Sequence, residues 1–189
     1  MIDLLQGAGI FIYPLGFCSI MAIFIIIERL LALRSSKIVP SEIADQFIMG
    51  TMPEEGDRKS VAGRIILFFH SRKPDIEQLK AFARVEVNGM ERGMFILDII
   101  VSAAPLIGLL GTVTGLVKVF AKINPDTGMP DPTMFVEGVA LALTTTMLGL
   151  SIAIPALVFT NYLYRRVDTL ATRINLGVER LIALSDLKK

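Results

Sequence analysis

The sequence is poor in the residues that build catalytic and metal sites. Its 189 residues include one cysteine, Cys18, and one histidine, His70, which is expected at the surface. A single cysteine excludes an intrachain disulfide, and no residues show the usual spacing of a metal cluster. We therefore predict neither a cofactor nor a metal site. The apolar runs contain no paired aspartates and no serine–histidine dyad, so we predict no enzyme and assign no catalytic residue.

An excess of charge of one sign is also lacking. The net charge is +1 at pH 7, which argues against nucleic acid as a partner, because its binding needs a concentrated basic patch. The first nine residues contain Asp3 but no Lys or Arg. The basic start of a cleavable signal peptide is therefore missing, and we expect the first apolar run to stay in place as an anchor.

What the chain has in excess is apolar residues. They make up 53% of the sequence, and the mean hydropathy is +0.62. A helix that crosses roughly 30 Å of hydrocarbon needs about 20 such residues. Three runs are long enough, at about Gly9–Ile27, Phe95–Phe120 and Met134–Tyr164. We therefore predict an all-α integral membrane protein with three transmembrane helices.

The basic residues predict the orientation of these helices. Only Lys118, at the end of the second run, and Lys122 lie near the connection to the third run, and the others follow the first run, precede the second or follow the third. Basic residues favour the cytoplasmic side, so the N-terminus is expected in the periplasm and the C-terminus in the cytoplasm. The expected regions are a first transmembrane helix (1–33), a cytoplasmic helical segment (34–93), a pore region with two transmembrane helices and a short periplasmic loop (94–164), and a cytoplasmic amphipathic tail (165–189).

Helix signals also occur outside the three runs. Pro74 and the acids after it read as a helix start, and this helix is expected to continue into the second run as one long helix, with a kink at Pro105. Asp131 can cap the third helix with Pro132 at its first position. Thr51–Lys59 reads as an exposed turn. We expect the apolar face of the tail to pack against a neighbouring subunit. The apolar positions of this face are Leu163, Val167, Leu170, Ile174, Val178, Leu181 and Leu184.

Glycines and hydroxyls distinguish the second and third runs from ordinary lipid-facing helices. Gly108, Gly111 and Gly115 share one helical face, where they would let another backbone approach. The third run carries three consecutive threonines, Thr144–Thr146, and hydroxyls at bilayer depth need partners or a wet path. We therefore expect two helices that pack around something polar. Close packing without an ion role remains an alternative for the glycines, as does a hydroxyl bonded back to its own helix for the threonines.

The face of the third run that carries Thr146 predicts a narrow pore wall. Its other members are Ala142, Gly149 and Ala153, and Gly149 is also assigned to helix packing. Thr144 and Thr145 point elsewhere and are expected to pack. Asp98, an acid inside an apolar run, is a functional candidate, with a salt bridge to a basic neighbour as the equal alternative.

Two motifs in this order resemble the MotA/TolQ/ExbB proton-channel family, and its ExbB and TolQ branch most closely. The first is A-P-L-I-G-L-L-G-T-V-T-G, Ala104–Gly115, and the second is A-L-T-T-T-M-L-G-L-S-I-A-I-P-A-L, Ala142–Leu157. The resemblance implies a homopentameric subunit of a motor in the bacterial inner membrane. Its pore would enclose the single transmembrane helices of two copies of an ExbD/TolR-like partner, and proton flow would drive work in the cell envelope.

The resemblance also implies the residues of the ion pathway. The pore threonines of the family match Thr112 and Thr146, with Thr145, Asp98 and Glu137 as secondary candidates. Relatives often have a glutamate where this chain has Leu141, and Glu137 lies about a turn further out, at the expected external mouth. The essential carboxylate is therefore expected from the partner. A passive membrane scaffold is the alternative function, and sodium is the alternative ion, because oxygen ligands also suit a hard cation.

Overall fold

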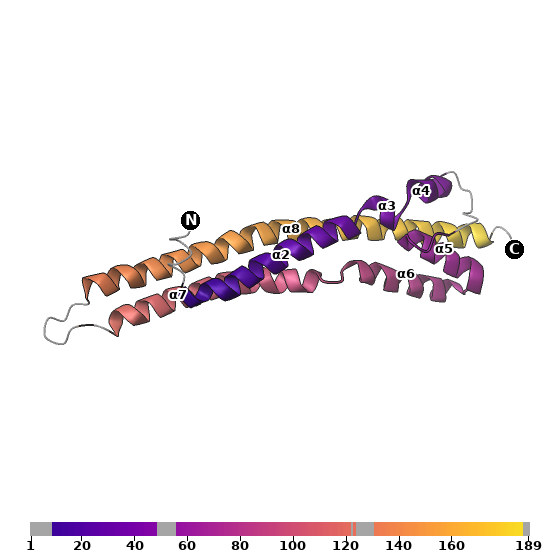
Figure 1. The fold of residues 1–189 in the computed structure, drawn as a ribbon. Coiled ribbons are helices and arrows are strands. Elements are labelled where there is room, and N and C mark those ends of the chain that lie inside the picture. The colour runs from indigo at the N-terminus through magenta and orange to yellow at the C-terminus, as the bar shows by residue number, and fades with distance from the viewer. Residues whose placement is uncertain (1–8, 49–55, 122, 124–130, 187–189) are drawn as a thin grey trace. The chain divides into compact units, whose positions relative to one another are not determined.

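The computed structural model describes residues 9–48, 56–121, 123 and 131–186, and their regular elements are all helices (Figure 1). In chain order the helices are η1 (Gly9–Phe11), α2 (Ile12–Ala32), α3 (Ser35–Ile38), α4 (Ser41–Ile48), α5 (Val61–Arg72), α6 (Ile76–Met90), α7 (Met94–Phe120) and α8 (Pro132–Asp186). The predicted all-α class is confirmed. Most of the predicted loop between the second and third runs, and residues 51–55 of the predicted turn, lie outside the described residues.

Three helical stretches of the described residues are long and apolar enough to cross a bilayer. They are Gly9–Ala32, Ile76–Phe120 and Pro132–Ser185. Each contains one of the apolar runs predicted from the sequence. The predicted number of candidate spans is therefore confirmed for the part of the chain that the structure describes.

Helix α8 begins where its capping residues predict. The side chain of Asp131 accepts hydrogen bonds from the backbone nitrogens of Thr133, at 2.8 Å, and Met134, at 3.2 Å. These bonds satisfy amide groups that have no partner inside the first turn. The helix then continues for 55 residues, through Pro155, to Asp186. The third apolar run and the tail are therefore one uninterrupted helix.

The expected single helix from Pro74 into the second apolar run is wrong. Asp75 and Gln78 form a capping box at the start of α6, and this helix ends at Met90. Gly93 then has a φ of 85°, a left-handed conformation that favours glycine, and α7 begins at Met94. The chain thus breaks at Gly93, while α7 continues through Pro105 without interruption.

Contacts between residues divide the chain into two units. Unit 1 is Met1–Ile26 with Gly93–Thr160, and unit 2 is Ile27–Arg92 with Asn161–Lys189. Helices α2 and α8 contribute to both units, whereas α7 belongs to unit 1 and α3 to α6 belong to unit 2. The segment 34–93 and the tail 165–189, which are separate regions in the prediction, thus lie almost entirely in one unit.

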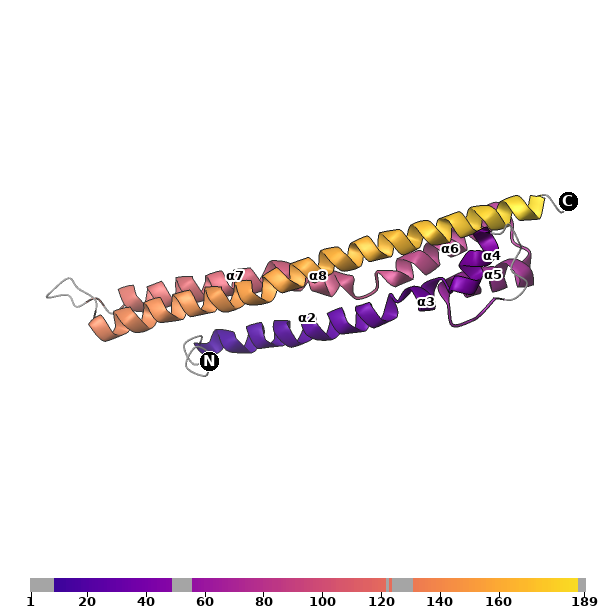
Figure 2. The ribbon, with the colours of Figure 1, turned by 90° about the horizontal axis from the view of Figure 1, so that it is seen from above.

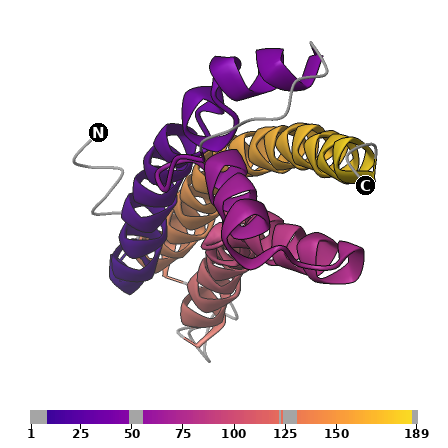
Figure 3. The same ribbon diagram turned by 90° about the vertical axis from the view of Figure 1, so that its right-hand side faces the viewer.

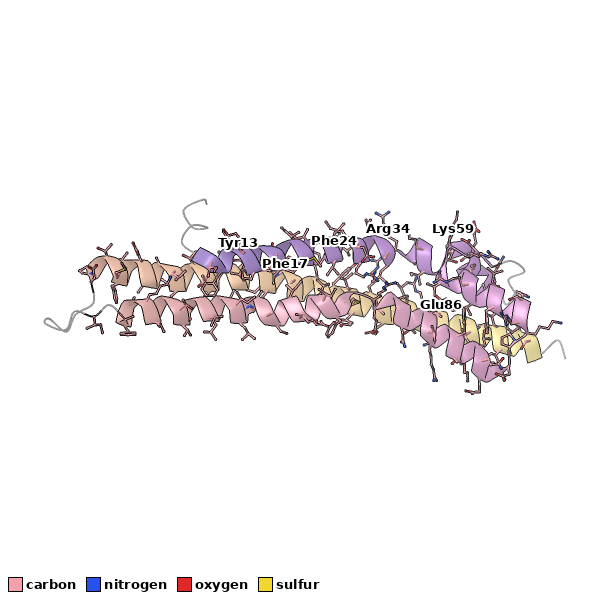
Figure 4. All side chains as sticks on the ribbon, turned by 60° about the horizontal axis from the view of Figure 1, so that its bottom comes forward. Tyr13, Phe17, Phe24, Arg34, Lys59 and Glu86 are labelled. Atoms are coloured by element: carbon pink, nitrogen blue, oxygen red, sulfur yellow. The ribbon has the colours of Figure 1, made fainter. Side chains whose placement is uncertain are left out.

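Unit 1 has apolar side chains on its outside as well as in its core. Its buried cluster joins Leu15 of α2, Ala104 of α7 and Ala153 of α8. Large apolar side chains are exposed on all three helices, and Figure 4 shows Tyr13 and Phe17 projecting from α2. A surface of this kind is unfavourable in water and suited to lipid or to another apolar helix.

Unit 2 has a core of its own. Helices α5 and α6 lie side by side (Figure 3), and the rings of Phe68 and Phe82 stack with centroids 4.3 Å apart. Arg64 of α5 donates hydrogen bonds to the carboxylate of Glu86 on α6, with 3.1 Å from its Nε to either oxygen. This hydrogen bond to Glu86 raises the pKa of Arg64 above its ordinary value.

The tail of α8 supplies the other half of this core. The members of the predicted apolar face from Leu163 to Leu181 are buried inside the chain. Ile174, Val178 and Leu181 line one small cavity together with Ile65 and Ile66 of α5. The expectation that this face packs against a neighbouring subunit is therefore wrong, because the helices between the first and second spans fold over it.

This packing predicts a stability difference between two residues of the tail. Ile174 is 3% exposed and Leu176 is 58% exposed. Ile174→Ala should lower the free energy of unfolding by about 2–5 kcal/mol, because it leaves a cavity. Leu176→Ala removes a similar volume from the surface and should change it by less than about 0.5 kcal/mol. Thermal unfolding of both variants in detergent measures the difference, and equal losses would contradict burial of the tail inside its own chain.

Candidate ion pathway

Helices α7 and α8 run antiparallel in unit 1 (Figure 2), and glycines set the closeness of their contact. A Cβ added at Gly108 would lie 2.9 Å from the carbonyl oxygen of Thr145. One added at Gly149 would lie 2.6 Å from the carbonyl oxygen of Ala104. Side-chain carbons do not approach backbone this closely, so only glycine permits this separation of the helices at these points.

Gly111 and Gly115 extend the same contact along α7. A Cβ on Gly111 would overlap the side chain of Thr145, and a Cβ on Gly115 would overlap the carbonyl oxygen of Gly138. All four glycines assigned to packing from the sequence thus lie where α7 meets α8. The contact also includes Ala142, which would meet a Cβ on Gly115, so part of the expected pore wall faces α7 of the same chain.

Thr145 fills the space that the glycines leave. It is 0% exposed, and its hydroxyl donates a hydrogen bond to the carbonyl oxygen of Leu141 at 2.8 Å. Its side chain lies against Gly111. The hydroxyl is thus satisfied by its own helix inside the contact. Its neighbour Thr144 is buried as well.

Thr112 of α7 and Thr146 of α8 are both half-buried. Thr146 lies against the turn of α7 that precedes Thr112. The hydroxyl of Thr146 lies 3.4 Å from the carbonyl oxygen of Gly108 and donates to it across the helix contact. The hydroxyl of Thr112 donates to the carbonyl oxygen of Leu109, at 2.7 Å. Antiparallel packing therefore brings the two sequence-predicted pathway threonines to neighbouring turns. Thr112 is bonded back to its own helix, and Thr146 is bonded to the other helix.

This geometry defines what the two hydroxyls can do. A threonine hydroxyl has one proton to donate and two lone pairs, and it does not change charge near neutral pH. With both protons directed to carbonyls, the oxygens offer lone pairs to a donor such as a protonated carboxyl group or water. If the hydroxyls turn away from the carbonyls, they can donate to a carboxylate instead. The pair can therefore serve either protonation state of an acid.

The structure does not bring the acidic candidates to this point. Asp98 is half-buried near the start of α7, and Glu137 is exposed near the start of α8. Because the helices are antiparallel, these two acids lie toward opposite ends of the pair. Neither forms a cluster with Thr112 and Thr146.

Leu141, at the position where the sequence resemblance leads us to expect a glutamate in relatives, is part of the packing. It is 8% exposed, and a Cβ added at Gly9 of η1 would lie 3.6 Å from its Cδ1 atom. A carboxylate at this position would lose most of its hydration, which is costly without a partner. The leucine is therefore consistent with a wall that carries no charge of its own at this level.

One buried hydroxyl escaped the sequence analysis. Thr160 of α8 is 3% exposed, and its Oγ1 has no hydrogen-bond partner among the described residues. An unsatisfied buried hydroxyl costs about 1–3 kcal/mol. The sequence could have identified Thr160 by its spacing. It follows Thr146 by fourteen residues and Ala153 by seven, which places the three residues on one helical face.

Comparison with known proteins places this helix pair in a family. Residues 58–175, more than half of the chain, match the MotA/TolQ/ExbB proton channel family. The chain belongs to this family. The match includes both sequence motifs, all of α7 and most of α8, and it confirms the resemblance on which the pathway residues were assigned.

Individual relatives of the family agree with this assignment. The biopolymer transport protein ExbB of Helicobacter pylori is 38% identical over 100 residues, which are 52% of this chain and 68% of that protein. ExbB of Aquifex aeolicus is 35% identical over 126 residues, 67% of this chain and 83% of that protein. The exbB1 protein of Vibrio cholerae is 28% identical over 173 residues, 82% of this chain and 75% of that protein.

Family membership and the three candidate spans together establish the class of protein. The chain is a multi-pass membrane protein of a proton channel family, and it is similar to ExbB proteins. Thr112 and Thr146 therefore lie on the two helices that match the proton channel family.

Proposed function

We propose that this chain is the pore-forming subunit of a proton-driven motor in the bacterial inner membrane. Five copies would form a ring around the single transmembrane helices of two copies of an ExbD/TolR-like partner. Proton flow through the ring would drive mechanical work in the cell envelope. Nutrient import across the outer membrane, envelope constriction, gliding and flagellar rotation are all compatible with this activity.

The observation that carries the proposal is the position of the half-buried Thr112 and Thr146 hydroxyls on neighbouring turns of the α7–α8 contact. Unit 1 has an apolar exterior, so these oxygens lie in a part of the molecule suited to the bilayer. Polar groups at this depth are costly unless they serve a polar path or a partner. A passive scaffold would need the glycine contact but not the hydroxyls.

The group that carries the proton should come from the partner. Proton coupling needs a group that changes charge within the membrane, which threonine cannot do. Asp98 and Glu137 lie toward opposite ends of the helix pair, and Leu141 is packed. A carboxylate on the partner helix would have its pKa raised by burial among apolar walls, and hydrogen bonds donated by Thr112 and Thr146 would offset part of this rise.

The proposal also assigns sides of the membrane. Unit 2 holds most of the segment 34–93 and the tail 165–189, and the distribution of basic residues favours the cytoplasm for both. The N-terminus and the loop between α7 and α8 would then be periplasmic. The pore itself would be built from α7 and the first part of α8, within residues 94–164.

Proton flux tests the proposal directly. Proteoliposomes that contain this chain together with its single-span partner should acidify when a proton gradient is imposed, and those with the chain alone should conduct far less. A pH-sensitive dye enclosed in the vesicles measures the flux. A complex that assembles fully but conducts no protons would favour the alternative of a passive scaffold.

Selective collapse of the gradients identifies the ion. With the sodium gradient collapsed and the proton gradient kept, activity that depends on the motor should persist, because the ExbB-like motifs point to protons. The measurement is the energised process in cells or the partner's response in vesicles. Loss of activity would overturn proton coupling in favour of sodium.

A further inference from the structure

A basic cavity in unit 2 has no role in the proposed ion pathway. It has a volume of about 320 Å³ and lies between the start of α3 and the part of α8 that follows the third apolar run. Arginine and hydroxyl side chains dominate its lining, and none of the described residues that line it is acidic. Its lining residues are Ser35, Tyr162, Arg165, Arg166, Thr169, Leu170 and Arg173.

The charge of the cavity comes from three arginines of α8. Arg165, Arg166 and Arg173 form no ion pair within the described ranges. Arginine stays protonated at any physiological pH, so the three guanidinium groups repel one another when the cavity holds no anion. A bound anion would relieve this repulsion and stabilise the unit.

The polar groups of the cavity are held in place by the fold. Arg166 donates from Nε to the carbonyl oxygen of Leu33, at 2.8 Å, directly after the end of α2. It also donates from a terminal nitrogen to the hydroxyl oxygen of Tyr162, at 2.9 Å. Arg173 lies 3.4 Å from the hydroxyl of Ser35 and donates to it. Both hydroxyls accept these bonds, which leaves their own protons for an anionic oxygen.

The chemistry of the lining favours a phosphate group. Guanidinium groups bind phosphate oxygens in pairs through parallel N–H bonds, and hydroxyls at the rim can complete the coordination. The surroundings favour a phosphate that carries an apolar tail. Tyr162 is exposed at the end of the third apolar run, and the apolar side chains of Ile27 and Leu31 are exposed on the same unit, in the turns that precede Ser35.

We propose that this cavity binds the headgroup of an anionic phospholipid at the cytoplasmic face of the membrane. Basic side chains just beyond the end of a transmembrane helix are well placed for such headgroups. Arg165 and Arg173 contact the phosphate. Hydrogen bonds to Leu33 and Tyr162 fix the position of Arg166 in the same cavity. The lipid joins the end of α2 to α8 within unit 2.

Lipid retention by the delipidated full chain in mild detergent tests this site. Native mass spectrometry should show that the chain retains dioleoylphosphatidylglycerol more strongly than dioleoylphosphatidylcholine, which has the same acyl chains and no net charge. The double variant Arg165→Gln with Arg173→Gln should weaken retention of phosphatidylglycerol about 10- to 30-fold. The control, Arg72→Gln with Arg180→Gln, removes two exposed arginines from outside the cavity and should change retention less than about 3-fold.

A second variant closes the cavity without changing its charge. Thr169 is exposed on α8 and lines the cavity, so Thr169→Phe should fold and weaken phosphatidylglycerol retention as the arginine variant does. If both variants retain phosphatidylglycerol like the unmodified chain, the site is wrong. If excess inorganic phosphate displaces phosphatidylglycerol completely, the cavity is a site for soluble phosphate, and the lipid proposal is overturned.

Discussion

Replacing Thr146 by valine is expected to leave assembly intact and to reduce proton flux about 10- to 100-fold. Valine keeps the shape of the side chain but removes the hydroxyl that lies 3.4 Å from the carbonyl oxygen of Gly108. A hydrogen bond to a charged group is worth about 1.5–3 kcal/mol, and every 1.4 kcal/mol is roughly a factor of ten. The loss should be similar for Thr112→Val. Proteoliposome flux with the partner present measures both.

The chain offers matched controls for these variants. Thr145→Val makes the same chemical change one residue away, but the side chain of Thr145 is fully buried in the contact with α7. Thr114→Val removes a hydroxyl that bonds to Leu110 and lies two residues after Thr112, on the other side of α7. Both controls should conduct nearly normally, and Asp98→Asn should do less harm than either pathway variant. If Thr112→Val and Thr146→Val conduct normally while Asp98→Asn abolishes flux, the relay belongs to this chain and the proposed pathway is wrong.

Replacing Gly149 by a larger residue is expected to impair folding and assembly, rather than ion conduction alone. A Cβ at this position would lie 2.6 Å from the backbone oxygen of Ala104 and 3.3 Å from the Cα atom of Gly108. These are backbone atoms, so the neighbouring helix must move as a whole. Overpacking of this kind costs about 1–3 kcal/mol for a small group. Gly149→Ala should lower the yield of monodisperse assembly, and Gly149→Leu should abolish it.

Gly16 provides the control for this effect. It lies in α2 of the same unit, and a Cβ added there would meet nothing within 4 Å. Alanine is intrinsically better than glycine in a helix by about 1 kcal/mol, so Gly16→Ala should be neutral or stabilising. Size-exclusion chromatography in detergent, with thermal unfolding, compares the variants. Equal behaviour of Gly16→Ala and Gly149→Ala would show that α7 and α8 do not pack this closely.

Local signals in the sequence were enough to locate the three apolar spans but not every helix. Length and hydropathy identified the three candidate spans, and the Asp131–Pro132 pair identified the start of α8, because capping depends only on nearby groups. The break before α7 was not predicted from the sequence. The left-handed φ of 85° at Gly93 became evident only in the structure.

The motifs also led to the family, which the comparison confirmed, and they directed attention to Thr112 and Thr146. What the motifs could not supply was the partner of each hydroxyl. A helical face predicts which residues point the same way, but not which helix meets them. Only the antiparallel register of α7 and α8 decided that Thr145 fills the space at Gly111 while Thr146 reaches the carbonyl of Gly108.

The tail of α8 shows the same division most clearly. Periodicity in the sequence determined that one face of the tail must be covered, because its apolar residues recur at helical spacing. It did not determine what covers them, since a neighbouring subunit and another part of the same chain satisfy the pattern equally. Only the tertiary structure shows that α5 and other parts of unit 2 cover this face, because burial depends on contacts between segments that are distant in the sequence.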